Sequence, residues 1–418
     1  DPTSDLRMFV YQQTKQGTLS NPTIYKGFQF TPFSIAIGDV NNDMLNDVVI
    51  GYDDSVGIFY QNNTGGLNQL KGFYSGNFSR IDGLDIGDLN GDGLTDIALS
   101  HWDSKIVTIL YQKINGSFYL TTLYLTLQTD NHILKIADIN NDKRDDIIVS
   151  INEGLALFYQ TADGHLSSCM SVSNLNSLIP VNGLAIGDLN NDGLTDVAQS
   201  LSGEATDAKI FMYLQDKVNH DIHNPSNIVA HQNPEAIQIA DINCDGGNEI
   251  IVAHGGEQTL TIYEQNGGLY STFKSVTIAD ASHFNPYGMS IGDINNDKKK
   301  DIALADYKNG LVTLINTSTT ISNCNTQLSA PSQPSGTNTI CKLGAGSIYK
   351  STAPLADSIL WNVYPNDAGI ITTANNDSCV IVWNDTWYGK ANITAKALYN
   401  NEAIGSLPLT ITVHTPPL

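Results

Sequence analysis

The chain has 418 residues and a formal net charge of −22, from 43 acidic and 21 basic side chains. This balance argues against a nucleic-acid partner, because proteins bind phosphates through clustered Lys and Arg. No apolar run approaches the roughly 20 residues of a membrane-spanning helix, and the length is sufficient for two domains. The chain begins at Asp1 without Met, and we expect that an export signal has been removed.

The N-terminal residues form two short apolar stretches, 6–12 and 23–25, which predict a pair of β-strands. They match the third and fourth strands of the repeat that follows. The first two strands of that repeat and its acidic loop are missing here.

An acidic loop of nine residues then recurs six times, with starts 49, 50, 50, 53 and 52 residues apart. Its pattern is Asp-x-Asn-x-Asp-x-x-x-Asp, with Glu in the last place of the fifth copy. A short β-branched strand precedes each loop, and three further strands follow it, the third often ending in Tyr-Gln. In the second copy these four stretches are 84–86, 97–99, 109–112 and 118–123.

Four short strands per repeat, without helical periodicity, predict one blade of a β-propeller. We therefore expect an all-β chain, with a six- or seven-bladed β-propeller over residues 1–318.

The loops predict calcium sites. Hard divalent cations prefer six to eight oxygen ligands, which the acid and amide side chains at loop positions 1, 3, 5 and 9 supply, with a carbonyl near position 7. Without a cation, carboxylates crowded into nine residues would repel one another. We expect about six Ca²⁺ ions, bound by Asp39, Asn41, Asp43, Asp47, Asp88, Asn90, Asp92, Asp96, Asp138, Asn140, Asp142, Asp146, Asp188, Asn190, Asp192, Asp196, Asp241, Asn243, Asp245, Glu249, Asp293, Asn295, Asp297 and Asp301.

Loop position 6 differs between copies. It is Gly at residues 93, 193 and 246, and Met44, Lys143 or Lys298 elsewhere. Gly accepts a positive φ without steric cost, so the other loops are expected to be strained. The third and sixth loops also carry basic neighbours at residues 143–144 and 298–300, and we expect them to bind calcium more weakly.

The repeated segments, such as LDIGDLNGDGLTDIAL at residues 84–99, resemble FG-GAP/VCBS repeats. These are the calcium-loop blades of integrin α-subunit propellers and of many secreted bacterial proteins. The resemblance covers about residues 5–320 and implies Ca²⁺ in the first hairpin of each blade. It does not imply one activity, because the family includes adhesion proteins, lectins and the scaffolds of some polysaccharide lyases.

A linker rich in Ser, Thr, Asn, Gln and Pro is expected at residues 319–336. Residues 337–418 then show an all-β pattern that predicts a small β-sandwich. Segments 339–341, 359–361, 368–371 and 380–383 resemble a PKD-like module, and the order Cys341, Trp361, Cys379 loosely resembles the immunoglobulin arrangement. The resemblance implies a spacer or adhesive stalk, with Cys341 and Cys379 as candidates for a disulfide.

Two ways of closing the propeller fit the sequence. The N-terminal strand pair completes the sixth blade, or forms a reduced seventh blade, within one molecule. Alternatively, an open blade edge accepts a strand from a neighbouring molecule, and a head-to-tail version would build a fibre.

The loop face opposite the acidic loops is a candidate ligand face, because aromatic residues with polar neighbours suit carbohydrate stacking. The alternative is that these residues simply pack around the ring. The candidates on this face are Tyr52, His101, Trp102, His254, Tyr287 and Tyr307. Candidate N-glycosylation sequons lie at Asn62, Asn77, Asn115, Asn316, Asn376, Asn384 and Asn392.

No nucleophile elbow, zinc-protease motif or nucleotide-binding loop is present, so we expect a protein that is not an enzyme. The sequence predicts an extracellular, calcium-stabilised adhesive or structural protein that contacts proteins or glycans at the cell surface. Self-assembly into a fibre by strand addition is a further hypothesis. A carbohydrate-binding lectin is the main alternative, and a polysaccharide lyase is the next.

Overall fold

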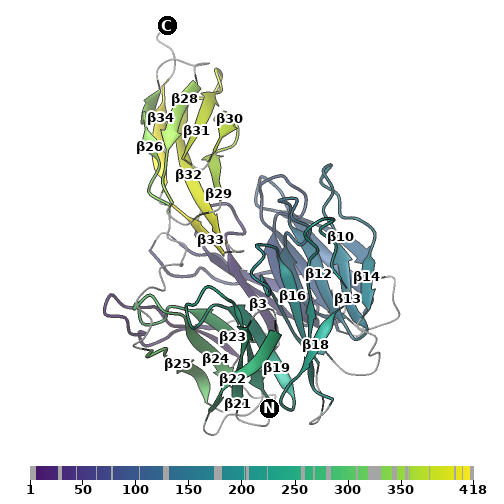
Figure 1. The fold of residues 1–418 in the computed structure, drawn as a ribbon. Helices are drawn as coiled ribbons and strands as arrows, with labels where there is room; N and C mark the ends of the chain where they lie inside the picture. Colours follow the sequence, from purple (N-terminus) through teal and green to yellow (C-terminus); the bar gives the residue numbers. More distant parts are fainter. Residues whose placement is uncertain are drawn as a thin grey trace. The chain divides into compact units, whose positions relative to one another are not determined.

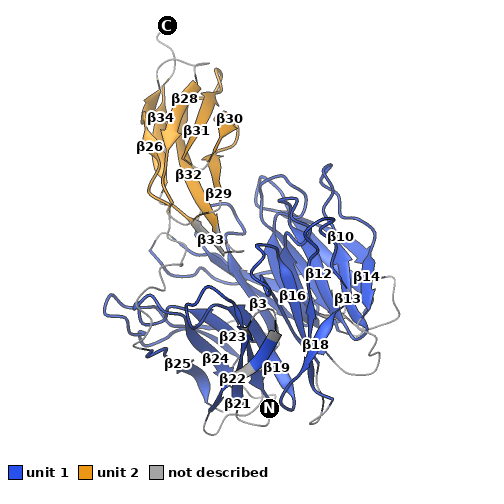
Figure 2. Cartoon of the chain, viewed as in Figure 1, with its two compact units in different colours: residues 1–321 blue, residues 322–418 orange. Residues whose placement is uncertain are grey.

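A computed structural model describes residues 6–26, 31–43, 45–62, 64–76, 79–102, 104–125, 131–173, 181–201, 203, 207–223, 225–255, 259–266, 269–278, 284–306, 309–318, 331–340, 346–353, 356, 358–375, 377–399, 402–406 and 408–414. Every regular element among these residues is a β-strand (Figure 1). The chain divides into two compact units, residues 1–321 and 322–418 (Figure 2).

The first unit contains six successive antiparallel sheets, each opening with two strands joined by an acidic loop. Within each sheet the strands lie in chain order. The first three sheets consist of β3 (Pro32–Gly38), β4 (Asp47–Tyr52), β5 (Ser55–Phe59) and β6 (Lys71–Tyr74); β7 (Ile81–Gly87), β8 (Asp96–His101), β9 (Ile106–Gln112) and β10 (Phe118–Tyr124); and β11 (Asn131–Ala137), β12 (Asp146–Ile151), β13 (Gly154–Phe158) and β14 (Met170–Ser173).

The last three sheets of this series repeat the arrangement, although the sixth has three strands among the described residues. They consist of β15 (Val181–Gly187), β16 (Asp196–Leu201), β17 (Lys209–Tyr213) and β18 (Ser226–Val229); β19 (Pro234–Ala240), β20 (Glu249–His254), β21 (Thr259–Asn266) and β22 (Leu269–Thr277); and β23 (Phe284–Gly292), β24 (Asp301–Asp306) and β25 (Gly310–Leu314).

The burial of each strand follows from its residues. The second strand begins with the acid of loop position 9 and continues as a mostly apolar run, and in the first five sheets all six of its residues are buried. Such runs are typical of strands covered on both faces. The fourth strand is mostly exposed, as in β6 and β18, so each sheet runs from a covered inner edge to a solvated outer edge.

The apolar core of this unit lies between neighbouring sheets. Val49 of the first sheet and Leu84 of the second belong to one buried cluster. Leu157 of the third sheet and Phe211 of the fourth belong to another. Each sheet therefore depends on its neighbours to cover its apolar faces, which is the organisation of a β-propeller.

The N-terminal strands β1 (Arg7–Val10) and β2 (Thr23–Lys26) form a separate two-stranded sheet, the N-terminal hairpin. Met8 and Tyr25 pack against the buried Phe59 cluster of the first sheet. Gln13 donates hydrogen bonds to the carbonyls of Asp293 and Ile294 in the sixth acidic loop, both at 3.0 Å. The hairpin thus contacts the first and the last of the six sheets within one molecule.

The second unit is a small β-sandwich built from two sheets around one apolar core. Trp361, Trp383 and Tyr349 are among its buried side chains. One sheet contains β26 (Ser335–Gly336), β28 (Gly346–Lys350), β31 (Ser378–Trp383) and β30 (Gly369–Ala374); the other contains β27 (Thr339–Ile340), β34 (Leu409–Val413), β32 (Gly389–Tyr399), β29 (Ser358–Tyr364) and β33 (Glu402–Gly405).

Two details of this unit correct the sequence-based predictions. Strand β26 lies inside residues 319–336, the segment predicted as a linker, because Ser335 and Gly336 pair with Lys350 and Tyr349. The predicted disulfide is also wrong. Cys379 is a free thiol, 1% exposed in the apolar core, and its burial raises the pKa to about 12; Cys341 lies outside the described residues.

Candidate metal centres

In each acidic loop the backbone turns around the carboxylate of the first residue, which accepts hydrogen bonds from N–H groups later in the loop. In the second loop, Asp88 Oδ1 accepts hydrogen bonds from the N–H groups of Gly91 at 2.7 Å and Asp92 at 3.2 Å. Asp88 Oδ2 accepts a third from Gly93 at 2.9 Å. The bond from the fifth residue's N–H to the first carboxylate occurs in all six loops, so the first acid lies at the centre of every turn.

The ninth residue of each loop is a fully buried carboxylate. Asp96 Oδ2 accepts the N–H of Leu89 at 3.0 Å, and Asp96 Oδ1 accepts the N–H of Gln112 at 2.8 Å. This acid therefore joins the start of the loop to the end of the third strand. The equivalent acids, also 0% exposed, are Asp47, Asp146, Asp196, Glu249 and Asp301.

Burial raises the pKa of five of these acids. Burial raises the pKa of Asp96 to about 7, and the nearby carboxylates of Asp92 and Asp88 add to the effect, while two backbone N–H bonds oppose it. The pKa is raised for the same reasons to about 7 at Asp146, Asp196 and Glu249 and to about 6 at Asp47. A cation beside them would stabilise the charged form of each acid and so offset the burial and the repulsion that raise these pKa values.

The prediction of strain at loop position 6 is confirmed for the two lysines. Lys143 has a φ of 69° and Lys298 a φ of 68°, in the left-handed region that favours glycine. Their counterpart Gly193 has a φ of 84° and carries no side chain to strain. Met44 lies outside the described residues.

Basic side chains reach the fifth-position acids of three loops. Arg144 forms an ion pair with Asp142 in the third loop. Lys299 Nζ lies 3.7 Å from Asp297 Oδ2 in the sixth loop, and Lys217 Nζ lies 3.8 Å from Asp192 Oδ2 in the fourth. These cations would compete with a metal ion for the same oxygens.

The donor chemistry of the loops fits a hard cation. The predicted ligand side chains offer carboxylate and amide oxygens, as Ca²⁺ prefers, and in each loop a 0%-exposed acid lies within the same nine residues. Among the described residues, no three His, Cys, Asp or Glu side chains are already gathered closely enough to hold an ion. Amide and main-chain oxygens, such as those of Asn90 and Asn190, would thus have to share in the coordination.

A side-chain amide links each of the second to sixth sheets to the acidic loop of the sheet before it. Gln160 donates to the carbonyl of Asp88 at 2.7 Å, and Gln265 donates to that of Leu189 at 2.7 Å. Gln112, Gln215 and Asn316 make the equivalent bonds to Val40, Ile139 and Ile242. The recurring Tyr-Gln at the third strand was visible in the sequence, but its role as a link between sheets was not predicted.

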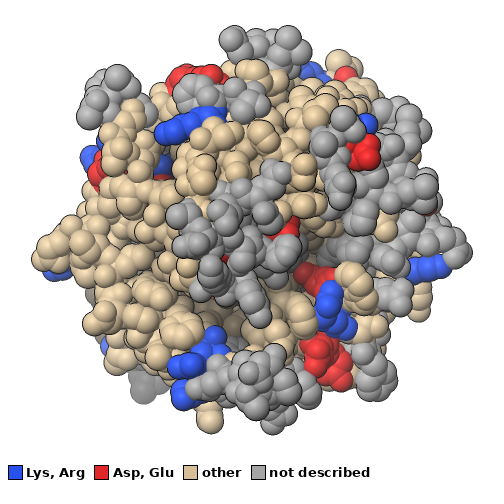
Figure 3. Space-filling model, turned by 90° about the horizontal axis from the view of Figure 1, so that it is seen from below, with Lys and Arg blue, Asp and Glu red and all other residues tan. Residues whose placement is uncertain are grey.

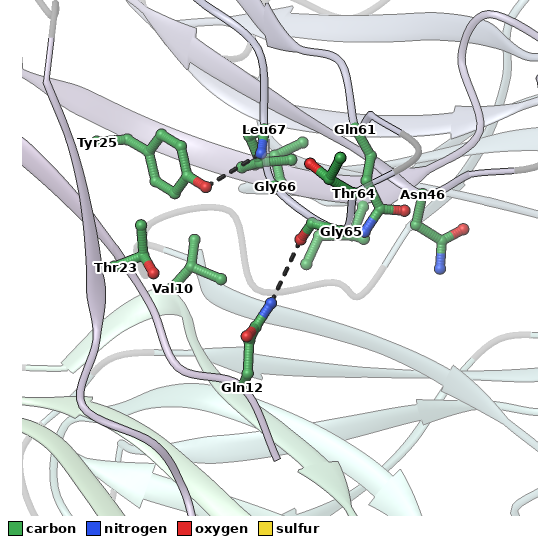
Figure 4. A pocket seen from close by; sticks show the side chains of 12 residues that line it. Val10, Gln12, Thr23, Tyr25, Asn46, Gln61, Thr64, Gly65, Gly66 and Leu67 are labelled. Atoms are coloured by element: carbon green, nitrogen blue, oxygen red, sulfur yellow. Dashed lines mark hydrogen bonds between the residues drawn. The ribbon is translucent and has the colours of Figure 1, made fainter. Parts of the chain in front are cut away.

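A cavity of about 470 Å³ lies between the N-terminal hairpin and the first sheet (Figure 4). Val10 and Tyr25 of the hairpin line it, together with Ile37, Asn46 and Gln61 of the first sheet. Gln12 donates to the Gly65 carbonyl at 3.3 Å, and the Tyr25 hydroxyl accepts the N–H of Leu67 at 3.0 Å.

The structure corrects the predicted ligand face. Tyr52 is 9% exposed, and His101 and His254 are 0% exposed, because the second strands end inside the ring. Trp102 is 47% exposed, but the Arg80 guanidinium lies 4.4 Å from its ring centre. Tyr307 and the side chain of Tyr287 lie outside the described residues. No set of exposed aromatic rings is therefore assembled from the described candidates.

The predicted sequons fall in different environments. Asn115 and Asn384 are exposed, and Asn62 and Asn392 are half-buried. Asn77 and Asn376 lie outside the described residues. The Asn316 side-chain nitrogen donates to the Ile242 carbonyl at 2.9 Å, a bond that a glycan on this nitrogen would disturb. Glycosylation of these residues stays a prediction.

Comparison with known protein families identifies the family to which the repeats belong. The profile described as FG-GAP-like repeat matches residues 39–99, 88–149, 138–198 and 241–304, which is more than half of the chain and includes all six acidic loops. The chain belongs to the FG-GAP-like repeat family. No curated protein matches it in sequence.

Solved structures with similar folds are β-propellers of low sequence identity. The periplasmic gluconolactonase of Pseudomonas aeruginosa is 13% identical, with 66% of this chain and 78% of that chain covered and a TM-score of 0.50. A protein described as a 6-phosphogluconolactonase from Bacteroides fragilis is 15% identical, with 65% and 77% covered and a TM-score of 0.49. At such identities the likeness shows the fold alone.

The expectation that this FG-GAP-like chain is not an enzyme is corrected by this comparison. A protein of similar fold is titled a gluconolactonase, which is an enzyme. The lack of a known catalytic motif in the sequence therefore does not exclude catalysis on this fold.

The surface charges are distributed in small groups. On the face shown in Figure 3, the described Lys and Arg side chains are separated from one another by uncharged residues. In the described part of the chain, no helix has the length and apolar character needed to cross a membrane.

Proposed function

We propose that this FG-GAP-like protein is an extracellular, calcium-stabilised adhesive or structural protein, and that its propeller binds about six Ca²⁺ ions. The observation that carries the proposal is the buried carboxylate at position 9 of every loop. In five of the six loops its pKa is raised by burial and by neighbouring acids. Bound Ca²⁺ would supply the positive charge that these acids lack.

The extracellular location is supported by two features. Calcium loops of modest affinity fill where free Ca²⁺ is abundant, as it is outside cells. Cys244, inside the fifth acidic loop, is disulfide-bonded, and disulfides persist mainly in oxidising compartments.

The adhesive or structural role is supported by the second unit. Its two sheets around one apolar core suit a spacer, and we propose that it is a PKD-like or Ig-like module that displays the propeller. Tyr52, His101 and His254 are buried and cannot stack on a sugar. This weakens the case for a carbohydrate-binding face, so we favour contacts with protein partners as the mode of action.

Two measurements on the full chain test this proposal. Differential scanning calorimetry in Ca²⁺ and in EDTA tests the calcium part, since ions that bind only the folded state stabilise it by mass action. A glycan array probed in Ca²⁺ tests the mode of action. The proposal expects calcium-dependent stability and no tightly bound glycan; a strong, saturable glycan signal would instead favour a lectin.

A further inference from the structure

Four amide residues each form hydrogen bonds to two successive acidic loops. Gln160, which follows the third strand of its sheet, donates its backbone N–H to Asp146 Oδ1 at 2.7 Å. Its side-chain nitrogen donates to the carbonyl of Asp88, also at 2.7 Å. Asp146 is position 9 of the third loop, and Asp88 is position 1 of the second. We call the residues that make both bonds the bridging residues: Gln112, Gln160, Gln215 and Asn316.

Each bridging residue ends on groups that would hold the ions. Its backbone bond fixes the buried carboxylate at position 9 of its own loop, which is a predicted ligand. Its side-chain bond fixes the carbonyl at position 1 or 2 of the preceding loop, which belongs to the first predicted ligand or to the residue beside it. Asp88, for example, accepts Gln160 through its carbonyl, while its carboxylate accepts N–H groups of the second loop. Two hydrogen bonds therefore connect the first turn of one loop to a ligand of the next.

The bridging residues of the second to fourth sheets are buried. Gln112 and Gln160 are 2% exposed and Gln215 is 3% exposed, while Asn316 is half-buried. A hydrogen bond away from water is electrostatically stronger than one at the surface, and losing it leaves a buried polar group unsatisfied. These amides therefore hold the two loops in one relative arrangement.

The link between the fourth and fifth loops has only one of the two bonds. Gln265 donates its side-chain amide to the Leu189 carbonyl of the fourth loop at 2.7 Å. The position-9 acid of the fifth loop is Glu249, and its carboxylate accepts the N–H groups of Ile242 at 2.9 Å and Asn243 at 3.3 Å. Both of these donors lie in the fifth loop itself. Gln265 is thus joined to the fourth loop but does not hold the acid of the fifth.

We propose that the bridging residues are positioning residues that couple neighbouring calcium sites, so that an ion in one loop raises the affinity of the next loop for its own ion. This inference rests on the proposed calcium binding and adds a regulation to it. An ion that fixes the start of one loop orders the bridging side chain there. The ordered bridging residue then holds the position-9 acid of the next loop, so the second ion has fewer groups left to order.

The coupling has a defined direction, size and extent. Thermodynamic linkage makes it mutual, so each of two coupled loops changes the affinity of the other by the same factor. One hydrogen bond to a buried group changes an equilibrium by roughly two- to tenfold, and we expect the coupling in that range. It joins the first four loops in series and the fifth to the sixth, and it is interrupted between the fourth and fifth.

The test is hydrogen–deuterium exchange of the full chain at increasing Ca²⁺ concentration, read by mass spectrometry, which gives a separate midpoint for each loop. Asp92→Ala removes a predicted ligand at an exposed position of the second loop. The proposal expects the midpoint of the third loop to rise by roughly two- to tenfold. Asp192→Ala, at the same position of the fourth loop, is the matched control and is expected to leave the midpoint of the fifth loop unchanged.

Gln160→Met separates coupling from a merely structural role. This variant keeps the backbone bond to Asp146 and loses the side-chain bond to Asp88, so Asp92→Ala in the same chain should no longer shift the third loop. A structural role alone would leave that shift in place.

Three results would overturn the coupling alone, while calcium-dependent protection still supports the proposed function. They are a third-loop midpoint that does not respond to Asp92→Ala, a response that persists in Gln160→Met, and a fifth-loop response to Asp192→Ala as large as that of the third loop to Asp92→Ala. If Ca²⁺ protected no loop of the wild type, the proposed function and the coupling would both be wrong.

Discussion

The propeller and the C-terminal sandwich differ in what they bury. Every acidic loop of the propeller places a fully buried carboxylate, such as Asp96 or Asp196, beside two other acids. The core cluster of the sandwich contains apolar side chains and one neutral thiol, Cys379. Burying a charge is costly unless it is paired, so we propose that a bound cation stabilises the propeller, whereas the core cluster of the sandwich buries no such carboxylate.

The two units also differ in how their buried apolar residues are distributed. The sandwich gathers its buried residues into one cluster around Trp383. The propeller distributes its apolar residues over clusters between neighbouring sheets, so each sheet relies on its neighbours to cover its apolar faces.

Calcium removal is expected to produce the largest contrast between the units. An ion at a concentration 100 times its Kd stabilises the folded state by about 2.7 kcal/mol, and the propeller has six candidate sites. In EDTA, calorimetry should show the propeller transition falling well below its value in Ca²⁺, with the sandwich transition unchanged. If both transitions moved together, or neither moved, the contrast would not exist.

Trp383→Ala should affect the sandwich alone. Trp383 is 1% exposed in the sandwich core, and truncating a buried aromatic residue typically costs about 3–5 kcal/mol. Denaturant unfolding should show the loss in the sandwich transition only, and calcium affinity should not change. Ile370→Ala, at a site 71% exposed in the same unit, is the matched control and should cost little. A weaker calcium affinity in Trp383→Ala would show that the units are not independent.

Acid should destabilise the propeller through His254. This side chain is buried, and desolvation lowers its pKa from the ordinary 6.5 to about 4. Below pH 6.5 His254 becomes protonated in the unfolded chain but stays neutral in the folded chain. The free energy of unfolding therefore falls as the pH drops from 6.5 to 4, by at most about 3 kcal/mol.

The variant His254→Asn isolates this contribution from the acids that titrate in the same range. Chemical denaturation at pH 7 and pH 4.5 should show a change in the free energy of unfolding that is less unfavourable on acidification in the variant than in the wild type, with the sandwich transition as an internal reference. If acidification changed the free energy of unfolding equally in the two proteins, His254 would not be a source of the pH dependence.

The smallest expected effect concerns the differences among the loops. Arg144 pairs with Asp142 in the third loop, where the fourth loop has Leu194. Arg144→Leu removes a competing cation and should raise calcium affinity at that loop by about two- to fivefold, the range of a partly exposed ion pair. Calcium titration followed by thermal shift measures it. An unchanged or weaker affinity would show that Arg144 does not compete with the ion.

The repeated hairpins were predictable because the period is local. Each acidic loop and its two flanking apolar runs stand within about 20 residues, and β7, β8 and the pairing of Gly87 with Asp96 follow from that spacing. The N-terminal strand pair was predicted in the same way, from its match to the later third and fourth strands.

Features set by distant residues were not predictable. His101 looks like an exposed loop residue in the sequence, yet its Nε2 lies 3.0 Å from the Thr108 hydroxyl inside the ring. The exposure of Ile37 on β3, 64%, depends on parts of the molecule that are far away in the sequence. The order Cys341, Trp361, Cys379 implied a disulfide, but sequence order does not show that Cys379 packs into an apolar core as a free thiol.

The central claim is that the acidic loops are calcium sites, and the direct test is to count the ions. The full chain is equilibrated with Ca²⁺ near neutral pH, separated from free ion, and analysed for bound calcium by mass spectrometry of the metal. The account predicts about six calcium ions per chain, with one fewer in a variant carrying Asp188→Ala and Asp192→Ala in the fourth loop. A chain that retains no calcium while remaining folded would contradict it.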